Sequence, residues 1–456
     1  MQQSVVAVRE GKVSGTETDT VTAFRGIPYA APPVGDLRFR PPTPHPGWDG
    51  VRDGSRPGPS APQGQSRLAA IMGSREPDWD ESGCLNLNIW TPAAALTPGA
   101  PPRPVLVWFH GGAWISGSGG WDWYDGGRLA AAGDIVVVTA NYRLGALGYL
   151  WIPAPGGDDP GADNLGSRDQ AAVLTWVRDN IAAFGGDPEA ITVGGQSAGA
   201  YSALALALDP ATGGLVRRVI LQSGPWGMAP RQPEAAAEIT RAHLAALGIA
   251  PDAVDPKAEL PGVPVADILA ATGRMAAERA KPGNPTPLVY PVLGGAGLPR
   301  PWQDALGDGG LAGKQVLVGS TAHEMTAFLG PVLDDGPAAA REARATEEFF
   351  GAGVTEIAAV CAAQGIPAYA YRFTRVSTAD PALGAAHCAE LPFMFGNLRA
   401  FAGGPMLGPV GDADRALARE MTAAFAAFVA TGVPAVGSDT SWPAYEPGGH
   451  IRTFGP

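Results

Sequence analysis

Short apolar segments that recur along the chain constrain the fold more than any other feature of the sequence. They are rich in β-branched residues, and each would present apolar side chains on both faces of a strand. Strands of this kind lie in the middle of a parallel sheet that helices cover on both faces. The six segments are residues 105–109, 135–141, 191–193, 219–221, 316–318 and 369–373.

Helical patterns lie between these segments. Residues 167–184 place apolar side chains three and four positions apart, as one face of a helix requires, and two glycines follow them. Further helices are expected at 198–208 and 415–431. Alternating strands and helices predict an α/β fold with a central, mostly parallel β-sheet flanked by helices. Ligands bind beyond the carboxyl ends of the strands in such a sheet.

The number of domains follows from length and hydrophobicity. The chain has 456 residues, of which 45% are hydrophobic, and this suffices for one large buried core. We therefore expect a single domain over residues 1–456. Residues from about 230 to 300 contain helical fragments broken by proline and no convincing strand, which predicts an insertion that caps the sheet.

A serine motif follows the apolar segment 191–193. Residues 195–199 read Gly-Gln-Ser-Ala-Gly, and an alanine-rich helix is expected directly after them. This is the pattern of a nucleophile elbow, in which flanking glycines allow the sharp turn around the serine. The pattern alone is weak, because in a chain with 63 glycines chance gives roughly 0.3 matches. Its position between a strand and a helix favours Ser197 as a nucleophile over an ordinary serine in a glycine-rich turn.

A second glycine-rich loop follows the segment 105–109. Residues 110–114 read His-Gly-Gly-Ala-Trp. Backbone N–H groups held in such a loop can stabilise the negative charge that develops on a carbonyl oxygen during acyl transfer. By itself the loop is equally typical of a simple turn. Two such loops after two strands together favour an acyl-transfer site.

A serine nucleophile needs a base and a carboxylate that orients the base. Four histidines follow Ser197 in the chain: His243, His323, His387 and His450. With a nucleophile elbow the expected order is serine, acid, histidine. Glu324 follows the segment 316–318 and His387 follows 369–373, so this pair satisfies the order. His323 is the alternative base, although it shares a loop with the acid.

Charge and cysteine content narrow the class of protein. The net charge is −12 and the pI is about 5, which disfavours nucleic acid and anionic membranes as partners. Residues 1–5 lack a basic region followed by an apolar one, and no apolar run reaches eighteen residues, so we expect neither a secretory signal nor a membrane span. The three irregularly spaced cysteines predict reduced thiols, no metal site and a cytoplasmic location.

Several longer motifs carry a family resemblance. They include Phe-Arg-Gly-Ile-Pro-Tyr-Ala at 24–30, Cys-Leu-Asn-Leu-Asn-Ile-Trp-Thr-Pro at 84–92, Asn-Tyr-Arg-Leu-Gly at 141–145, the stretch 169–188 and Leu-Gln-Ser-Gly at 221–224. With the two loops above, they make the chain resemble the type-B carboxylesterase family over nearly its whole length. That family includes bacterial p-nitrobenzyl esterases and cholinesterases. The resemblance implies the α/β-hydrolase fold.

The resemblance also implies roles for individual residues. It makes Ser197 the nucleophile, Glu324 the acid and His387 the base. The oxyanion hole would consist of the backbone N–H groups of Gly112, Ala113 and Ala198. Arg143 and Asp169 match a structural ion pair of the family and receive no catalytic role.

Several positions depart from the family pattern, and three of them concern the base and the thiols. Gln196 stands where the family usually has glutamate, so the negative charge beside the base is missing. Cys84 matches a half-cystine whose expected partner is absent here, which agrees with reduced thiols. Cys388 replaces a glycine directly after His387, and we interpret it as an inert buried thiol.

These residues predict a serine carboxylic ester hydrolase. It would cleave small to medium, mostly neutral carboxylic esters through an acyl-enzyme intermediate, without a cofactor. The expected substrate pocket includes Trp114, Gln196, Trp226, Phe328 and Phe393. The alternatives are an amidase, carbamate or thioester hydrolase with the same triad, and a non-catalytic binding protein of the same fold. The expected partner is a small-molecule ester, and both a monomer and a homodimer remain open.

Overall fold

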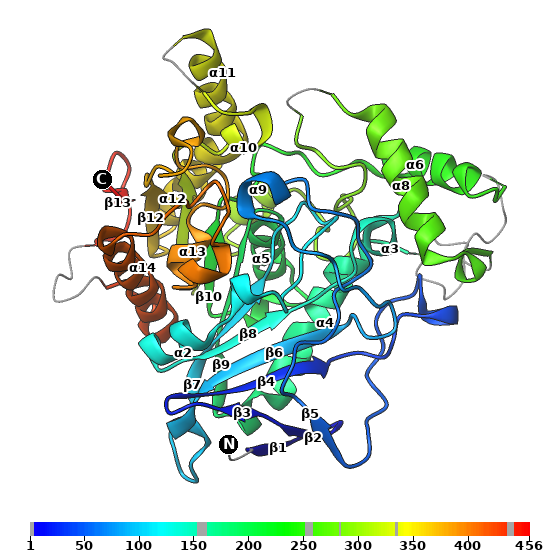
Figure 1. Ribbon diagram of the computed structural model, residues 1–456, viewed down its shortest axis with the longest axis horizontal. Helices are drawn as coiled ribbons and strands as arrows, with labels where there is room; N and C mark the ends of the chain where they lie inside the picture. The colour runs from blue at the N-terminus through cyan, green and yellow to red at the C-terminus, as the bar shows by residue number, and fades with distance from the viewer. Residues whose placement is uncertain (1–3, 153–161, 251–258, 282–283, 333–335, 436–441) are drawn as a thin grey trace.

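The computed structural model describes residues 4–152, 162–250, 259–281, 284–332, 336–435 and 442–456. Ten strands form one large sheet in the order β13-β12-β11-β10-β9-β7-β8-β6-β4-β3 (Figure 1). All pairs from β13 to β8 are parallel, and those that join β8, β6, β4 and β3 are antiparallel. A separate small sheet contains β1, β2 and β5.

The strands of the large sheet have the following bounds: β3 Thr16–Glu17, β4 Val21–Pro28, β6 Asn86–Pro92, β7 Arg103–Phe109, β8 Val136–Ala140, β9 Gly186–Gln196, β10 Arg218–Gln222, β11 Gln315–Thr321, β12 Ala368–Phe373 and β13 Arg452–Phe454. Those of the small sheet are β1 Val5–Val8, β2 Gly11–Ser14 and β5 Val51–Asp53. Each of the six apolar segments coincides with one of β7 to β12. The prediction of a mostly parallel α/β sheet is confirmed.

Alternation along β7 shows why both faces of the sheet are apolar. Val105, Val107 and Phe109 face one hydrophobic cluster, whereas Leu106 and Trp108 face another. Successive side chains of a strand point to opposite faces of the sheet. A wholly apolar strand therefore needs packed helices on both faces. Helices α4, α5 and α12 supply the first cover, and α2 and α14 supply the second.

The helices have the following bounds: α1 Ala69–Met72, α2 Gly127–Gly133, α3 Gly145–Tyr149, α4 Leu165–Asn180, α5 Ala198–Leu208, α6 Pro233–Ala246, α8 Val265–Arg279, α9 Trp302–Gly307, α10 Thr326–Leu329, α11 Pro337–Thr346, α12 Ala352–Ala363, α13 Leu391–Met394 and α14 Asp412–Thr431. The expected helix 167–184 is α4 followed by a 3₁₀ turn, Ile181–Phe184. The one at 198–208 is α5, and α14 begins three residues before the expected 415.

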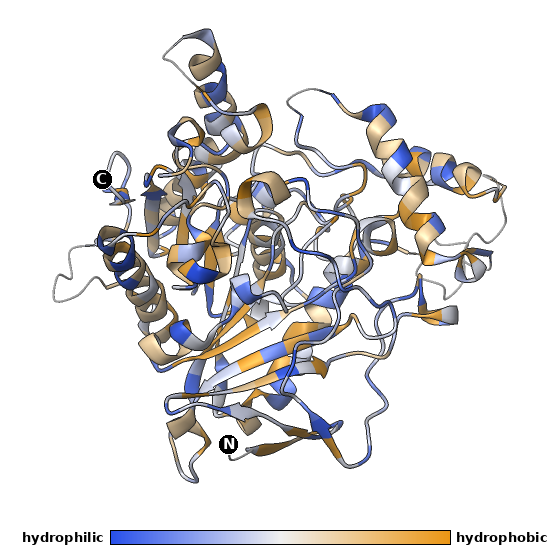
Figure 2. Ribbon diagram, in the orientation of Figure 1, coloured by the Kyte–Doolittle hydropathy of each residue, from blue (hydrophilic) through white to orange (hydrophobic). Residues whose placement is uncertain are grey.

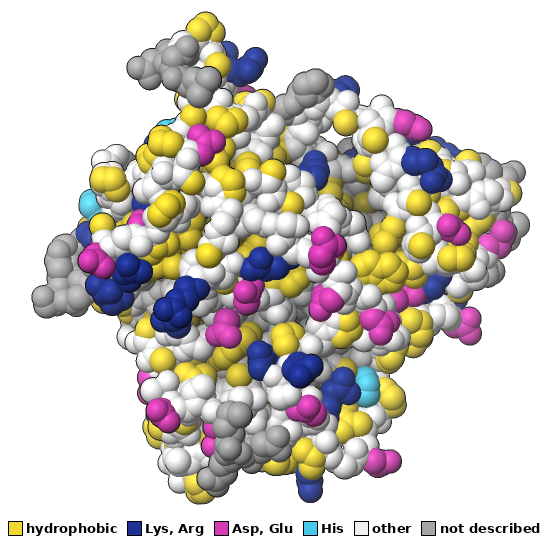
Figure 3. Space-filling model, in the orientation of Figure 1, with side chains coloured by type: hydrophobic (Ala, Val, Ile, Leu, Met, Phe, Trp, Pro, Cys, Tyr) yellow, Lys and Arg dark blue, Asp and Glu magenta, His cyan; other side chains and the backbone are white. Residues whose placement is uncertain are grey.

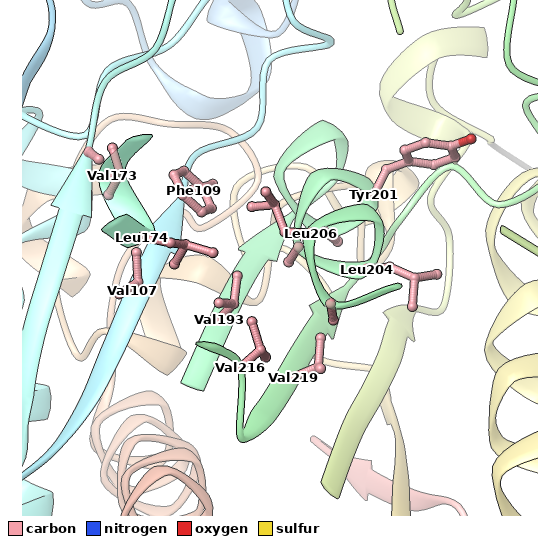
Figure 4. Close-up of a cluster of buried hydrophobic side chains, with 14 of the residues drawn as sticks. Val107, Phe109, Val173, Leu174, Val193, Tyr201, Leu204, Leu206, Val216 and Val219 are labelled. Carbon is pink, nitrogen blue, oxygen red and sulfur yellow. The ribbon is translucent and has the colours of Figure 1, made fainter. Parts of the chain in front are cut away.

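The first cluster fixes the strands against α4 and α5. In Figure 4, Val107, Val193 and Val219 of three neighbouring strands face Leu174 of α4 and Leu204 of α5. Burying an aliphatic side chain of this size stabilises the fold by about 1.5–3 kcal/mol. Figure 2 shows hydrophobic residues along the central strands and mixed residues along the outer helices. The core therefore holds rigidly the strand ends from which the site is built.

Helices α6 and α8 belong to the segment expected to form a cap. They pack on each other and α8 packs on α3, at the right-hand edge of the molecule in Figure 1. Apart from an isolated bridge between Arg231 and Val292, the described part of this segment contains no strand. Its remaining residues, 251–258 and 282–283, lie outside the described ranges. A role as a cap stays a prediction.

One buried ion pair ties the loop after β8 to α4. Arg143 donates from Nε and Nη2 to the carboxylate of Asp169, at 2.8 and 2.7 Å, and both side chains are buried. Asp169 also accepts the backbone N–H of Arg143. The expected structural ion pair is confirmed.

Two further features concern membrane spans and cysteines. Within the described ranges, no helix is long and apolar enough to cross a membrane. Cys84, Cys361 and Cys388 are all free and buried.

Candidate active site

Ser197 lies in a sharp turn between the end of β9 and the start of α5. Its φ of 57° and ψ of −125° are rare for a residue with a side chain, and such strain is typical of functional turns. A Cβ on Gly195 would lie 2.3 Å from the backbone of Gly199, and one on Gly199 would lie 2.0 Å from the carbonyl oxygen of Phe109. Only glycine fits at either position. The turn has the geometry of a nucleophile elbow.

The loop after β7 lies against this turn. A Cβ on Gly111 would be 3.1 Å from the Cβ of Ser197, so the two backbones approach closely. Gly112, Ala113 and Trp114 all have positive φ, at 107°, 54° and 57°. The carbonyl oxygen of Gly112 accepts from two later N–H groups, which closes the loop into a tight turn.

Two backbone donors at the start of this loop have no acceptor among the described residues. Over the described residues, no hydrogen bond uses the N–H of Gly112 or Ala113. Ala198 is the first residue of α5, so its N–H has no partner inside the helix. The three donors named as an oxyanion hole are therefore unpaired and come from the two segments that meet at Ser197. This arrangement can bind an oxyanion.

His387 and Glu324 form a buried pair. Nδ1 of His387 lies 2.5 Å from Oε2 of Glu324, and the side chains are 1% and 0% exposed. Oε1 of Glu324 accepts the N–H of Thr321, which fixes the carboxylate from its other side. An imidazole held in this way has its Nε2 facing away from the acid, where it can take a proton.

His323, the alternative candidate for the base, makes different contacts. Its Nδ1 accepts the N–H of Ala385 at 3.1 Å, and its backbone forms a short parallel bridge with Ala386. His323 therefore joins the loop after β11 to the loop that carries His387. It positions the acid and the base relative to each other, and Glu324 pairs with His387 instead.

Gln196 contacts the side of His387 that a nucleophile must use. Its Nε2 lies 3.2 Å from Nε2 of His387, whereas the described residues show no hydrogen bond between Ser197 Oγ and His387. An amide N–H can donate here only if the ring nitrogen carries no proton. The proton then sits on Nδ1, toward Glu324, which is the tautomer that a base needs. In this arrangement Gln196, and not Ser197, occupies Nε2 of His387.

A second buried carboxyl lies near the pair. Glu390 accepts from Ser223 Oγ at 3.2 Å, and Ser223 itself has a strained φ of 49°. Burial, and then the charge of Glu324, raise the pKa of Glu390 to about 8. Glu390 is therefore mostly protonated at neutral pH. The sequence motifs did not single out this residue.

Helix α11 supports the turn that carries the acid. The N–H of Met325, next to Glu324, donates to Glu342 Oε1 at 3.1 Å and to Thr346 Oγ1 at 3.0 Å. The hydroxyl of Thr346 in turn donates to Glu342. Both side chains are buried. No motif pointed to them, because their role depends on α11 packing against a loop some twenty residues earlier in the chain.

Two aromatic rings lie beside His387. Phe328, a predicted pocket residue, lies 5.4 Å from the imidazole between ring centroids, and Phe350 lies at 5.0 Å on a π-helical turn, Glu347–Gly351. Phe350 was not predicted. Rings this close exclude water from the imidazole.

The other predicted pocket residues are spread around the site. Trp114 and Trp226 both pack on Tyr201 of α5, at 5.7 and 6.2 Å. Phe393 is fully buried and packs on Phe373, and within the described chain no ring contact joins it to His387. Over the same residues, no three His, Cys, Asp or Glu side chains gather closely enough to hold a metal ion.

Comparison with known proteins agrees with this geometry. A sequence model described as the carboxylesterase family matches residues 2–349 and 337–452. The chain belongs to the carboxylesterase family. It is a carboxylic ester hydrolase with the α/β-hydrolase fold, as the sequence predicted.

Relatives of this carboxylesterase cover almost its whole length. It is 38% identical to a phenmedipham hydrolase of Pseudarthrobacter oxydans, with 95% of this chain and 91% of the relative aligned. It is 35% identical to the para-nitrobenzyl esterase of Bacillus subtilis, with 98% and 93% aligned. Among solved structures, a PNB esterase superposes with a TM-score of 0.87 at 32% identity, covering 99% of this chain and 96% of that one.

Proposed function

We propose that the protein hydrolyses small to medium carboxylic esters by acyl transfer to Ser197, with His387 as the general base and Glu324 as the acid that orients it. The observation that carries the proposal is the buried His387–Glu324 pair, which lies beside a strained serine and a set of unpaired backbone donors. A non-catalytic protein of the same fold would have no use for this combination.

In the first half of the reaction, His387 Nε2 takes the proton of Ser197 Oγ while the oxygen attacks the ester carbonyl carbon. The carbonyl oxygen becomes an oxyanion, which the N–H groups of Gly112, Ala113 and Ala198 stabilise by several kcal/mol, about 2.7–4 for one donor. The carbon–oxygen bond to the alcohol then breaks. The alcohol leaves with the proton held by His387.

In the second half, water replaces the alcohol. His387 takes a proton from the water as its oxygen attacks the acyl carbon, the same donors hold the second oxyanion, and the proton returns to Ser197 as the acid leaves. Glu324 stays ionised and stabilises the imidazolium in both halves. No cofactor takes part.

The predicted substrates have mostly neutral groups at the reacting bond. Phe328 and Phe350 flank His387. Trp114 directly follows the oxyanion donors Gly112 and Ala113, so apolar side chains border the reacting atoms. Such walls favour uncharged acyl and alkyl groups. The free, buried cysteines support a cytoplasmic location for this activity.

A panel of substrates tests the proposal. It contains p-nitrophenyl esters from acetate to octanoate, a p-nitroanilide and an acyl thioester. An N-acyl amide belongs in it because a relative from Rhodococcus erythropolis, 37% identical, is named a probable N-octanoylanthranilate hydrolase. We expect the esters to be cleaved best. A preference for the amides or the thioester would replace the ester assignment with one of the alternatives.

Three variants test the residue roles. Ser197→Ala and His387→Gln should each lose ester turnover while their circular dichroism and Tm stay close to the wild type. His323→Gln is the comparison, because it alters the histidine that joins the loops of the acid and the base and leaves the imidazole of His387 in place, so it should lose less turnover than His387→Gln. Turnover retained in His387→Gln and lost in His323→Gln would reverse the assignment of the base.

A further inference from the structure

A basic pocket lies beside the loop 110–114, which carries the oxyanion donors Gly112 and Ala113. It has a volume of about 430 Å³ and is lined by the carboxyl end of α8, residues after it and the loop before α1. Four of its lining side chains are cationic and none is acidic: Arg67, Arg231, Arg279 and Lys281. Because Asp and Glu outnumber Lys and Arg by 44 to 32 in this chain, ordinary surface composition does not explain such a lining. Figure 3 shows this face of the molecule hollowed between the α6–α8 pair and the body.

Two contacts join the pocket to the active site. Ile115 lines the pocket and follows Ala113 by two residues, so their Cα atoms are at most about 7.6 Å apart. On the other side, the Arg231 guanidinium lies 4.4 Å over the ring of Tyr290, which stacks on Trp114 at 6.4 Å. The pocket therefore adjoins the loop that holds the oxyanion donors.

Three of the four cations of this pocket lack a carboxylate partner among the described residues. Arg231 donates to the carbonyl oxygens of Pro287 and Leu288, and Arg67 donates to that of Pro285. Among the described residues, no carboxylate lies within ion-pair distance of Arg67, Arg231 or Lys281. Arg279 has only the exposed Glu278, at 3.8 Å.

The balance of charge in the pocket favours an anion. The end of α8 contributes a partial negative charge of about half a unit. Four full positive charges exceed it several times over, and guanidinium groups match carboxylates in shape and donor geometry. A cavity of this size also accommodates an aliphatic chain that leads from the reacting bond.

We propose that this pocket binds a carboxylate carried by the ester substrate at the end remote from the reacting bond. The preferred substrates are then ω-carboxyl esters, such as monoesters of aliphatic dicarboxylic acids, with an apolar segment next to the scissile carbonyl. This inference rests on the proposed esterase function and adds a substrate class to it. The neutral walls near His387 receive the reacting end, and the basic pocket receives the charged end.

The test compares pairs of esters of equal chain length. Mono-p-nitrophenyl esters of the dicarboxylic acids from glutaric to suberic acid are paired with the p-nitrophenyl esters of the corresponding monocarboxylic acids. At one chain length at least, kcat/KM of the wild type should favour the carboxylate member by about fivefold, mostly through KM. Raising the salt concentration should reduce this preference, because exposed charges are screened.

Charge-reversal variants locate the effect. The double variant Arg279→Glu with Lys281→Glu changes two exposed side chains of the lining. Exposed charge pairs change affinity by about 1.5- to 5-fold each, so we expect kcat/KM for the carboxylate esters to fall by about tenfold. The neutral esters should change by less than about twofold. Arg274→Glu is the control, because it lies on α8, is exposed and does not line the pocket.

The outcomes separate this inference from the proposed function. If the neutral esters are cleaved but no chain length favours the carboxylate, or if the double variant lowers both series equally, the pocket does not bind the substrate anion. An equal effect of Arg274→Glu on the carboxylate series would likewise overturn the assignment to this pocket. If the wild type cleaves neither series, the esterase function itself fails.

Discussion

Replacing Gln196 with glutamate changes an uncharged contact with the base into a charged one. The amide nitrogen lies 3.2 Å from Nε2 of His387, and both side chains are buried. At an effective dielectric constant of about 20, two unit charges this far apart attract by about 5 kcal/mol. Burial of the new carboxylate opposes part of this attraction. An opposite charge at such a distance commonly favours the charged form of a group by about one to three pH units.

The sign of the effect follows from the role of His387. A carboxylate at position 196 stabilises imidazolium, and imidazolium cannot accept the proton of Ser197. The acid limb of the kcat/KM profile should therefore move to higher pH in Gln196→Glu, by about one to three units. The measurement is a pH–rate profile from pH 5 to 9 with p-nitrophenyl butyrate, whose neutrality keeps substrate charge out of the comparison.

Gln196→Met is the control for the lost hydrogen bond. It removes the donor to His387 without adding charge, so its acid limb should stay near that of the wild type, and its rate should change by less than about tenfold. An acid limb that does not move in Gln196→Glu would refute the reasoning. It would mean that the side chain at position 196 turns away from Nε2 in the working enzyme.

Three further predictions concern residues around the site. Because burial and the charge of Glu324 raise the pKa of Glu390 to about 8, the folded protein retains a proton that the unfolded chain releases above about pH 4.3. Wild-type stability should therefore fall from pH 5 to pH 8 relative to Glu390→Gln, and an equal Tm difference between the two at both pH values would contradict this. Glu342→Ala should lower kcat about tenfold with little change in KM. Glu342→Gln keeps a hydrogen-bond acceptor and should retain most of the wild-type kcat. A change confined to KM would show that Glu342 does not support the turn that carries Glu324. Arg143→Met leaves Asp169 buried without its partner and should cost about 3–5 kcal/mol in urea unfolding, and a loss below about 1 kcal/mol would show that the pair is dispensable.

The central strands and the elbow could be predicted because local sequence determines them. A strand apolar on both faces has few places in a fold, and β7 to β12 all occupy such places. Glycines 195 and 199 are required by contacts within a few residues of Ser197 and with the neighbouring strand. Chain order favoured Glu324 and His387 but left His323 as an alternative base, the family resemblance then selected the pair, and the structure brings these two together.

What the sequence did not reveal depends on distant segments that meet in space. Glu342 and Phe350 reach the site only because α11 and the turn after it pack beside the loop of the acid. Glu390 is three residues from His387, but its protonation depends on burial that no motif encodes. Which side chain faces Nε2 of His387, Gln196 or Ser197, is a matter of rotamers in a packed turn. The basic pocket likewise gathers residues from positions 67 to 288.

Covalent labelling of Ser197 tests the central claim most directly. Diethyl p-nitrophenyl phosphate should react with the protein by attack of Ser197 Oγ on phosphorus, with loss of p-nitrophenolate that can be followed by its colour. We expect one equivalent of p-nitrophenolate per chain, loss of esterase activity in parallel, and a diethylphosphoryl group on the peptide that contains Ser197. His387→Gln should label far more slowly and Ser197→Ala not at all. A label on another residue, with full activity in Ser197→Ala, would contradict the account.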